Sequence, residues 1–204
     1  LQRERGASAG FIASSGSSME ETMKKQRLLT DRYYKVMDKD TKTLDMAKLG
    51  YKFARRANAS SRKLWKLPSI REKISSMSIE NNEANDLYDE IIDDILGTFQ
   101  EASVIIKDSE LSFPFTACIN LIMAKEMAGK ERAIITGLVA EDKPVTQSEM
   151  HDWMRVSKGQ EALLSVFEYQ MTERIRNEYH TKMSEPNIKA VMNIRKQISE
   201  NLTS

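Results

Sequence analysis

Two arginines stand out because each follows a glutamate within the same local pattern. Residues 3–13 align with residues 130–140 at a constant offset of 127 residues, which places Arg5 on Arg132 and Glu4 on Glu131. A guanidinium keeps its proton in proteins and presents a planar fork of N–H donors that fits the oxygens of a small anion. Arg5 and Arg132 are therefore the first candidates for a binding site.

The surroundings of these arginines raise the question of what neutralises them. In helices, Arg5 and Arg132 would each lie in a stripe of small and apolar residues, with no carboxylate three or four residues away. An unpaired buried charge is costly, so an anion must be supplied. One interpretation pairs Glu4 with Arg132 and Glu131 with Arg5 across helices. The other brings both arginines to one small anion.

The elements that would position these residues are helices. Apolar residues recur at steps of three and four, while only 8 Gly and 4 Pro interrupt the chain and no segment alternates with a period of two. These patterns predict an all-α fold of long helices in antiparallel bundles. The predicted helices cover residues 1–14, 19–40, 44–66, 69–78, 82–107, 114–141, 147–170, 172–183 and 187–202.

Two helix starts carry the sequence of a capping box, in which a hydroxyl and a carboxylate satisfy amide groups reciprocally. Ser18 with Glu21 predicts one start, and Thr146 with Glu149 predicts the other. Each follows a copy of the repeated segment after a short polar break. The chain is therefore expected to contain two similar helical units.

Composition excludes several classes of function. There are 31 Lys+Arg against 30 Asp+Glu, so the net charge gives no case for nucleic-acid binding. A basic run at Arg55, Arg56, Arg62, Lys63 and Lys66, with Trp65 among them, is interpreted as a solvated helix face. No metal-ligand spacing, phosphate loop or dinucleotide fingerprint is present, so we expect no cofactor. The single cysteine, Cys118, excludes an internal disulfide and is predicted to be a buried, inert thiol.

Segments in order along the chain resemble the bacterial nitrate- and nitrite-sensing domain. They are Leu1–Ser8, Gln26–Asp31, Leu67–Arg71, Tyr88 with the Ile and Leu residues after it, and Ala124–Ala133, with Gly159–Glu161 and the region of Phe167 also fitting. The resemblance implies one sensor domain over residues 1–204, made of two packed four-helix bundles. Its first unit would cover about 1–108 and its second about 109–204.

The resemblance also implies a function. Such a domain binds a small oxyanion, nitrate or nitrite, and is not an enzyme. Carried over by position, Arg5 and Arg132 are the ligand-binding candidates and Arg71 is a third. Supporting positions are Glu4, Ser8, Lys125, Glu131 and Thr136.

The context of the domain follows from the same resemblance. The chain starts at Leu1 inside a predicted helix, so we expect a fragment with its membrane helices and output module outside it. A chemoreceptor parent would place it outside the cytoplasm, and an antiterminator-type parent inside. We also expect a homodimer, with Met46, Leu49 and Phe53 as an additional apolar stripe. The alternative is a structural helical adaptor in which the Glu-Arg pairs are internal salt bridges.

Overall fold

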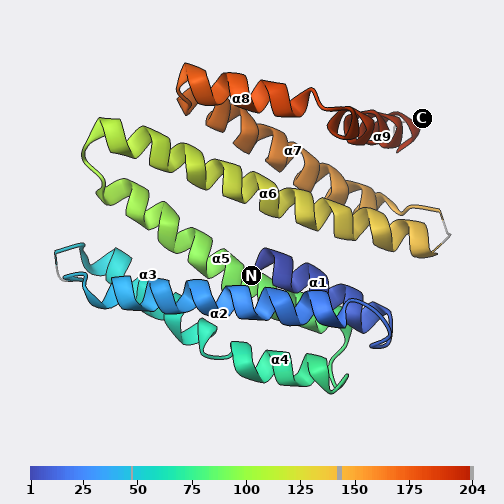
Figure 1. Cartoon of the computed structure of the whole chain (residues 1–204). Helices are drawn as coiled ribbons and strands as arrows, with labels where there is room; N and C mark the ends of the chain where they lie inside the picture. Colours follow the sequence, from blue (N-terminus) through green and yellow to red (C-terminus); the bar gives the residue numbers. More distant parts are fainter. Residues whose placement is uncertain (47, 142–143, 203–204) are drawn as a thin grey trace. The chain divides into compact units, whose positions relative to one another are not determined.

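The computed structural model describes the backbone of residues 1–46, 48–141 and 144–202, and the side chains of these residues except 137, 139–141, 201 and 202. Its regular elements are all helices, which confirms the all-α prediction for the described part (Figure 1). The helices are α1 (Gln2–Ala13), α2 (Glu20–Lys42), α3 (Tyr51–Leu64), α4 (Leu67–Ser75), α5 (Asn81–Ile105), α6 (Ser109–Glu141), α7 (Gln147–Gln170), α8 (Glu173–Met183) and α9 (Pro186–Leu202).

The chain divides into two compact units, residues 1–106 and residues 107–204. In unit 1, helix α5 is central: α1 and α3 pack along it, α4 also contacts it, and α1 packs on α2 as well. Apolar residues on α5 recur every three to four positions and are buried, among them Ala84, Tyr88 and Ile91. Phe11, Met23 and Ile74, from three other helices, complete this core.

Unit 2 is built on a long contact between α6 and α7, and α8 also packs against α9. Its core includes Ala117, Phe167 and Met171, against which Ile175 and Tyr179 of α8 are partly buried. The rings of Phe167 and Tyr179 meet edge to face, with their centroids 5.2 Å apart. This edge-to-face contact fixes α8 on the end of α7.

Two helix starts differ by more than two residues from those predicted. Helix α3 begins at Tyr51 instead of residue 44, because the chain turns at Gly50, whose φ of +90° suits only glycine well. Helix α6 begins at Ser109 instead of residue 114, and the carboxylate of Asp108 accepts from the amide of Glu110 at 2.9 Å. Pro114 therefore lies inside the helix and does not mark its start.

One predicted capping box forms and the other does not. Thr146 Oγ1 accepts from the Glu149 amide at 3.3 Å, and Glu149 Oε2 accepts from the Thr146 amide at 2.8 Å. Helix α2 instead begins after Met19, whose φ is +66°, without any side-chain cap. The Ser14 hydroxyl already accepts from the Ser18 amide, in a turn that holds residues 14–18 away from capping geometry.

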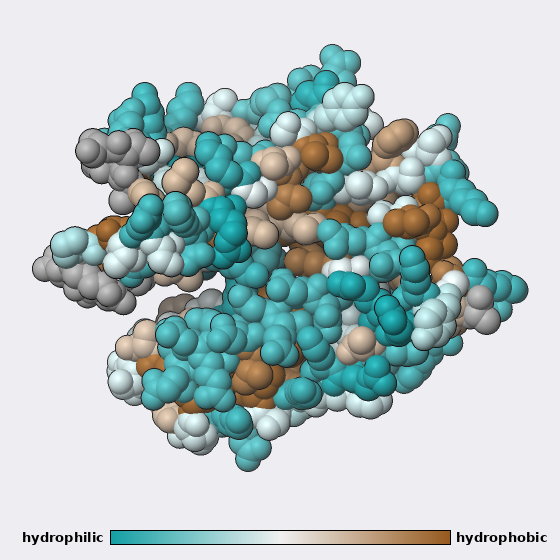
Figure 2. All heavy atoms as spheres, turned by 180° about the vertical axis from the view of Figure 1, so that it is seen from behind, coloured by the Kyte–Doolittle hydropathy of each residue, from teal (hydrophilic) through white to brown (hydrophobic). Residues whose placement is uncertain are grey.

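The surface corrects two further predictions. Cys118 is exposed, not buried. Met46 and Leu49 lie in the connection before α3, so they form no helical stripe with Phe53. Figure 2 shows one face of the molecule, on which hydrophilic side chains predominate and apolar ones gather in small patches. None of the described helices combines the length and apolar character needed to cross a lipid bilayer.

Candidate anion-binding site

Glu4 is completely buried and is held by side chains from other helices of unit 1. Arg71 of α4 donates from Nε and Nη2 to its two carboxylate oxygens, at 2.7 and 2.9 Å. Tyr88 of α5 donates from its hydroxyl to Oε1 at 2.8 Å. We call Glu4, Arg71 and Tyr88 the unit 1 clasp. It ties α1 to α4 and α5 through charge-assisted hydrogen bonds.

The electrostatics of this clasp fix its protonation. Burial by itself raises the pKa of Glu4, but hydrogen bonds from Arg71, Thr30 and Tyr88 outweigh it and hold that pKa below its ordinary value. Burial by itself lowers the pKa of Arg71, but its bonds to Glu4 and Asp31 raise it overall. Burial and the charge of Glu4 raise the pKa of Tyr88. At neutral pH the carboxylate is charged and the phenol is protonated.

Unit 2 contains a second clasp of the same kind around Glu131, which is also buried. Arg195 of α9 donates to both carboxylate oxygens of Glu131, with its Nε 2.8 Å from Oε1. Trp153 of α7 donates from Nε1 to Oε1 at 3.2 Å. Arg195 also donates to Gln160, whose own amide donates to the Ala124 carbonyl at 3.2 Å. We call Glu131, Arg195 and Trp153 the unit 2 clasp.

The two clasps share the glutamate of the repeated segment but differ in the sequence distance to their other members. Glu4 and its arginine are 67 residues apart, and Glu131 and its arginine are 64 residues apart. The neutral donor differs, since Tyr88 follows its glutamate by 84 residues and Trp153 by only 22. The repeated segment therefore supplies the buried glutamate, whereas its arginine comes from outside the repeat and each unit adds a different aromatic donor.

Arg5 lies on α1 beside the unit 1 clasp and is only 11% exposed. It forms an ion pair with Asp89 of α5, the residue that follows Tyr88. Ser8 is buried on the same helix, with its hydroxyl 3.4 Å from that of Tyr88. Arg5 and Ser8 thus face α5, and the anion that Arg5 requires comes from Asp89.

Arg132 lies on α6 in unit 2, and its side chain is exposed. Among the side chains that the structure describes, no carboxylate is within ion-pair distance of it. Two other predicted positions on this helix, Lys125 and Thr136, are exposed as well. Arg5 belongs to unit 1 and Arg132 belongs to unit 2.

The proposed exchange of partners between the two Glu-Arg segments is wrong. Glu4 binds Arg71 instead of Arg132, and Glu131 binds Arg195 instead of Arg5. Arg71, the third ligand candidate, uses its guanidinium within the protein: it donates to Glu4 and, at 2.6 Å, to Asp31.

Sequence reasoning did not identify Arg195, Trp153 or Asp89 as partners. One signal was present: Arg195 follows Glu131 by nearly the same interval that separates Arg71 from Glu4. Asp89 gave no such signal, because its approach to Arg5 depends on how α1 and α5 pack. Residues distant in sequence meet here through tertiary structure alone.

Comparisons with known proteins identify a family and a solved structure with a similar fold. The family model described as nitrate and nitrite sensing matches residues 1–204, the whole of this chain. The chain belongs to the nitrate and nitrite sensing family. A solved structure titled "Structure of the NasR transcription antiterminator" has a similar fold, with a TM-score of 0.79 and 19% identity over 90% of this chain. This chain covers 50% of that one. No curated protein sequence matches the chain at a significant level.

Proposed function

We propose that this member of the nitrate and nitrite sensing family binds nitrate or nitrite through Arg5 and Arg132. The observation that supports the proposal is that, in each Glu-Arg doublet, the glutamate pairs with a distant arginine and not with the arginine beside it. Glu4 and Glu131 are taken up by Arg71 and Arg195, so neither glutamate neutralises the arginine that follows it. Successive residues on a helix point about 100° apart, which directs Arg5 and Arg132 to other faces than the clasps.

The three candidate arginines then have different roles. Arg132 is exposed and positioned to meet a diffusing anion. Arg5 carries five N–H donors, of which Nη1 contacts Asp89, so an oxyanion would join or compete with that carboxylate. Arg71 instead acts in the unit 1 clasp and supports the orientation of α1. Ser8 supports the same helix through its packing against Tyr88.

Binding would be passed on as a shift between conformations. A ligand can shift an equilibrium only by its difference in affinity for the two states, and an anion shared by α1 and α6 favours the state that brings both guanidinium groups to it. The signal would pass to an output module beyond this chain, in a homodimeric signal-transduction protein. Both a receptor outside the cytoplasm and a cytoplasmic regulator of the antiterminator type are compatible with this scheme.

The alternative function is a helical adaptor without a ligand. It has support in the two clasps, which are internal Glu-Arg salt bridges of the kind that such an adaptor would use. Its arginines, however, are Arg71 and Arg195, so it leaves the exposed position of Arg132 without a role.

A thermal-shift series tests the proposed function. A ligand that binds only the folded state stabilises it by about 2.7 kcal/mol at 100 times its Kd. We expect nitrate and nitrite to raise the melting temperature at millimolar concentration more than chloride or sulfate at equal ionic strength. Equal shifts from all four anions would be a general salt effect and would contradict a dedicated site.

A further inference from the structure

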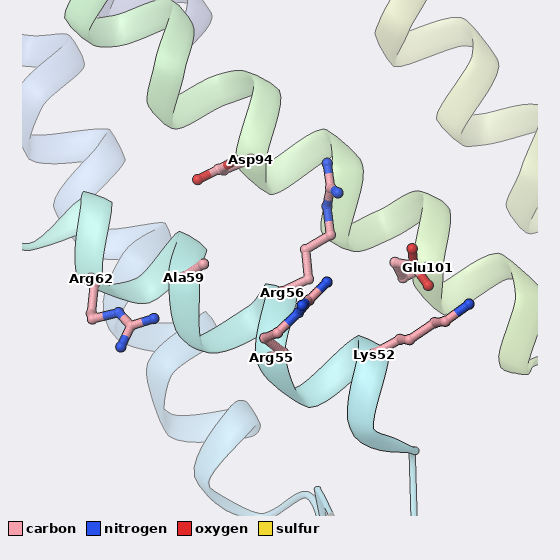
Figure 3. A pocket seen from close by; sticks show the side chains of 7 residues that line it. All are labelled: Lys52, Arg55, Arg56, Ala59, Arg62, Asp94 and Glu101. Carbon is pink, nitrogen blue, oxygen red and sulfur yellow. The ribbon is translucent and has the colours of Figure 1, made fainter.

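A cavity of about 550 Å³ lies in unit 1, between α3 and α5. Four cations of α3 and two carboxylates of α5 line it, namely Lys52, Arg55, Arg56, Arg62, Asp94 and Glu101 (Figure 3). No residue of this cavity belongs to either clasp or to the pair Arg5 and Arg132. Its size falls within the range of small-molecule pockets, which is about 300–1,000 Å³.

The charge in this cavity is not balanced by the protein. Asp94 forms its ion pair with Lys63, which lies 3.0 Å away and is not among the lining residues. In the part of the chain that the structure describes, Lys52, Arg56 and Arg62 have no carboxylate within ion-pair distance. These three side chains are exposed. The cavity therefore presents positive charge to an incoming anion.

The guanidinium of Arg56 lies against Gly97 of α5. Gly97 is buried in the middle of α5, and a methyl group added there would overlap the guanidinium of Arg56. Glycine weakens a helix interior, so its use here needs a reason, and the space for Arg56 supplies one. Nearby, Ser60 Oγ donates to the Asp94 carbonyl at 2.9 Å and lies 2.8 Å from Thr98 Oγ1. These contacts hold α3 close to α5.

The cations are spread along the helix and not focused on one point. From Lys52 to Arg62 the helix rises about 15 Å, at about 1.5 Å per residue. Ala59 lies between Arg55 and Arg62 and leaves room there (Figure 3). Such spacing suits a ligand with several anionic groups in a row better than a single nitrate. Arg55 also lies 5.9 Å from the centre of the Tyr51 ring, which is 77% exposed.

We propose that this cavity is a second anion site, which binds a nucleoside polyphosphate. Arg55, Arg56, Arg62 and Lys52 would contact the phosphates, since guanidinium groups match phosphate oxygens bidentately. Asp94 and Glu101 are acceptors for the hydroxyl or amino groups of a nucleoside. Tyr51 lies outside the lining residues, one turn before Arg55, and its exposed ring would meet a base that extends beyond the phosphates. The site is independent of nitrate binding by Arg5 and Arg132.

Calorimetry with ATP, pyrophosphate and adenosine tests the proposal in magnesium-free buffer. We expect ATP to bind most tightly, pyrophosphate more weakly, and adenosine not measurably. Gly97→Ala keeps every charge and suits a helix, but it displaces the Arg56 guanidinium. Gly97→Ala and Arg62→Ala should each weaken ATP binding about ten- to hundredfold, the effect of losing one charge-assisted contact. Arg32→Ala, which removes an exposed cation of α2, should not.

Four outcomes would overturn the proposal. Absence of ATP binding, or equal weakening by Arg32→Ala, would reduce the cavity to a solvated helix face. If pyrophosphate bound as tightly as ATP, the nucleoside would contribute nothing to binding and the ligand would be a plain polyphosphate. A short single-stranded RNA that binds more tightly than ATP, and loses affinity in the same two variants, would make α3 a nucleic-acid surface instead. Nitrate titration of Gly97→Ala, expected to match wild type, keeps this test separate from the proposed nitrate site.

Discussion

At the scale of single residues, the two members of the repeated Glu-Arg doublet have different roles: the glutamate forms a buried ion pair, and the arginine is the proposed anion ligand. The glutamate is buried and bound by a distant arginine, in unit 1 by Arg71 and in unit 2 by Arg195. A buried ion pair contributes little net stability compared with an apolar pair, but losing one partner strands the other. The clasps are therefore best understood as devices that fix the rotation of α1 and α6. That rotation decides where Arg5 and Arg132 point.

The unit 1 clasp makes a prediction about pH. Because folding lowers the pKa of Glu4, its contribution to stability is present above the ordinary value of 4.5 and is lost as pH falls through the lower folded value. Glu4→Gln should cost about 3 kcal/mol at neutral pH, measured by urea unfolding, because Arg71 loses a buried partner. The difference from wild type should shrink below pH 4.5.

The control for this prediction is Glu21→Gln, which changes an exposed carboxylate on α2. It should unfold like wild type at both pH values. A difference between Glu4→Gln and wild type that stays constant as the pH falls would show that Glu4 is not the titrating group.

Asp89 makes a second prediction at this scale. Its carboxylate pairs with Arg5, so it competes with any anion that this guanidinium binds. Asp89→Asn keeps an acceptor oxygen but removes one negative charge, which is worth at least about 1 kcal/mol at 4 Å, the value in bulk water, because Arg5 is only 11% exposed. Nitrate should then bind at least about fivefold more tightly by calorimetry. Asp86→Asn, an exposed position on the same helix, is the control, and weaker nitrate binding by Asp89→Asn would contradict the proposed role of Arg5.

At the scale of helices, the periodicity of apolar residues was sufficient to predict the elements. The apolar residues Ala84, Tyr88 and Ile91 recur at this spacing on α5 and are buried, whereas Phe99 farther along the helix is 37% exposed. Local chemistry explains the differences at helix ends, such as the capping carboxylate of Asp108 before Pro114. The partners of Glu4 and Glu131 could not be predicted, because they depend on which helices pack together across more than 60 residues of chain.

The two capping sequences give a matched pair of variants. Thr146→Ala removes an observed cap and should lower the free energy of unfolding by about 1 kcal/mol. Ser18→Ala removes a hydroxyl that caps no helix, so its effect should stay within about 0.5 kcal/mol. Chemical unfolding of both proteins measures the difference. An equal loss in the two variants would show that residues 14–20 adopt a different turn.

Helix α9 has no fully buried apolar side chain among its described residues, and it makes a charged contact with α6. Its apolar side chains Val191 and Ile194 are 54% and 53% exposed, whereas Arg195 reaches Glu131 and Gln160. Arg195→Leu should therefore release the helix, and its amides should exchange about a hundredfold faster if the lost pair is worth about 3 kcal/mol.

Hydrogen exchange followed by mass spectrometry measures this release. Lys189→Leu, an exposed position on the same helix, should leave the exchange of residues 186–202 as in wild type. Unchanged protection in Arg195→Leu would mean that apolar packing, not the unit 2 clasp, docks α9.

At the scale of the whole molecule, the chain is a repeat of two helical units that each hold a buried Glu-Arg clasp and an arginine beside it. The chain belongs to the nitrate and nitrite sensing family, and the proposed function assigns one arginine of each unit to the anion. Guanidinium groups suit a small planar anion with equivalent oxygens, because each presents a planar fork of N–H donors. Each unit supplies one of the two arginines that the proposed function uses.

Nitrate titration of a double-mutant cycle tests this central claim most directly. Calorimetry would compare wild type, Arg5→Ala, Arg132→Ala and the double variant, with Arg3→Ala as an exposed control on α1. If both arginines hold one anion, each single variant should lose about tenfold to a hundredfold in affinity, and the double variant should lose less than the sum of the two free-energy changes. Wild-type affinity in Arg132→Ala, or strictly additive losses, would contradict a shared site.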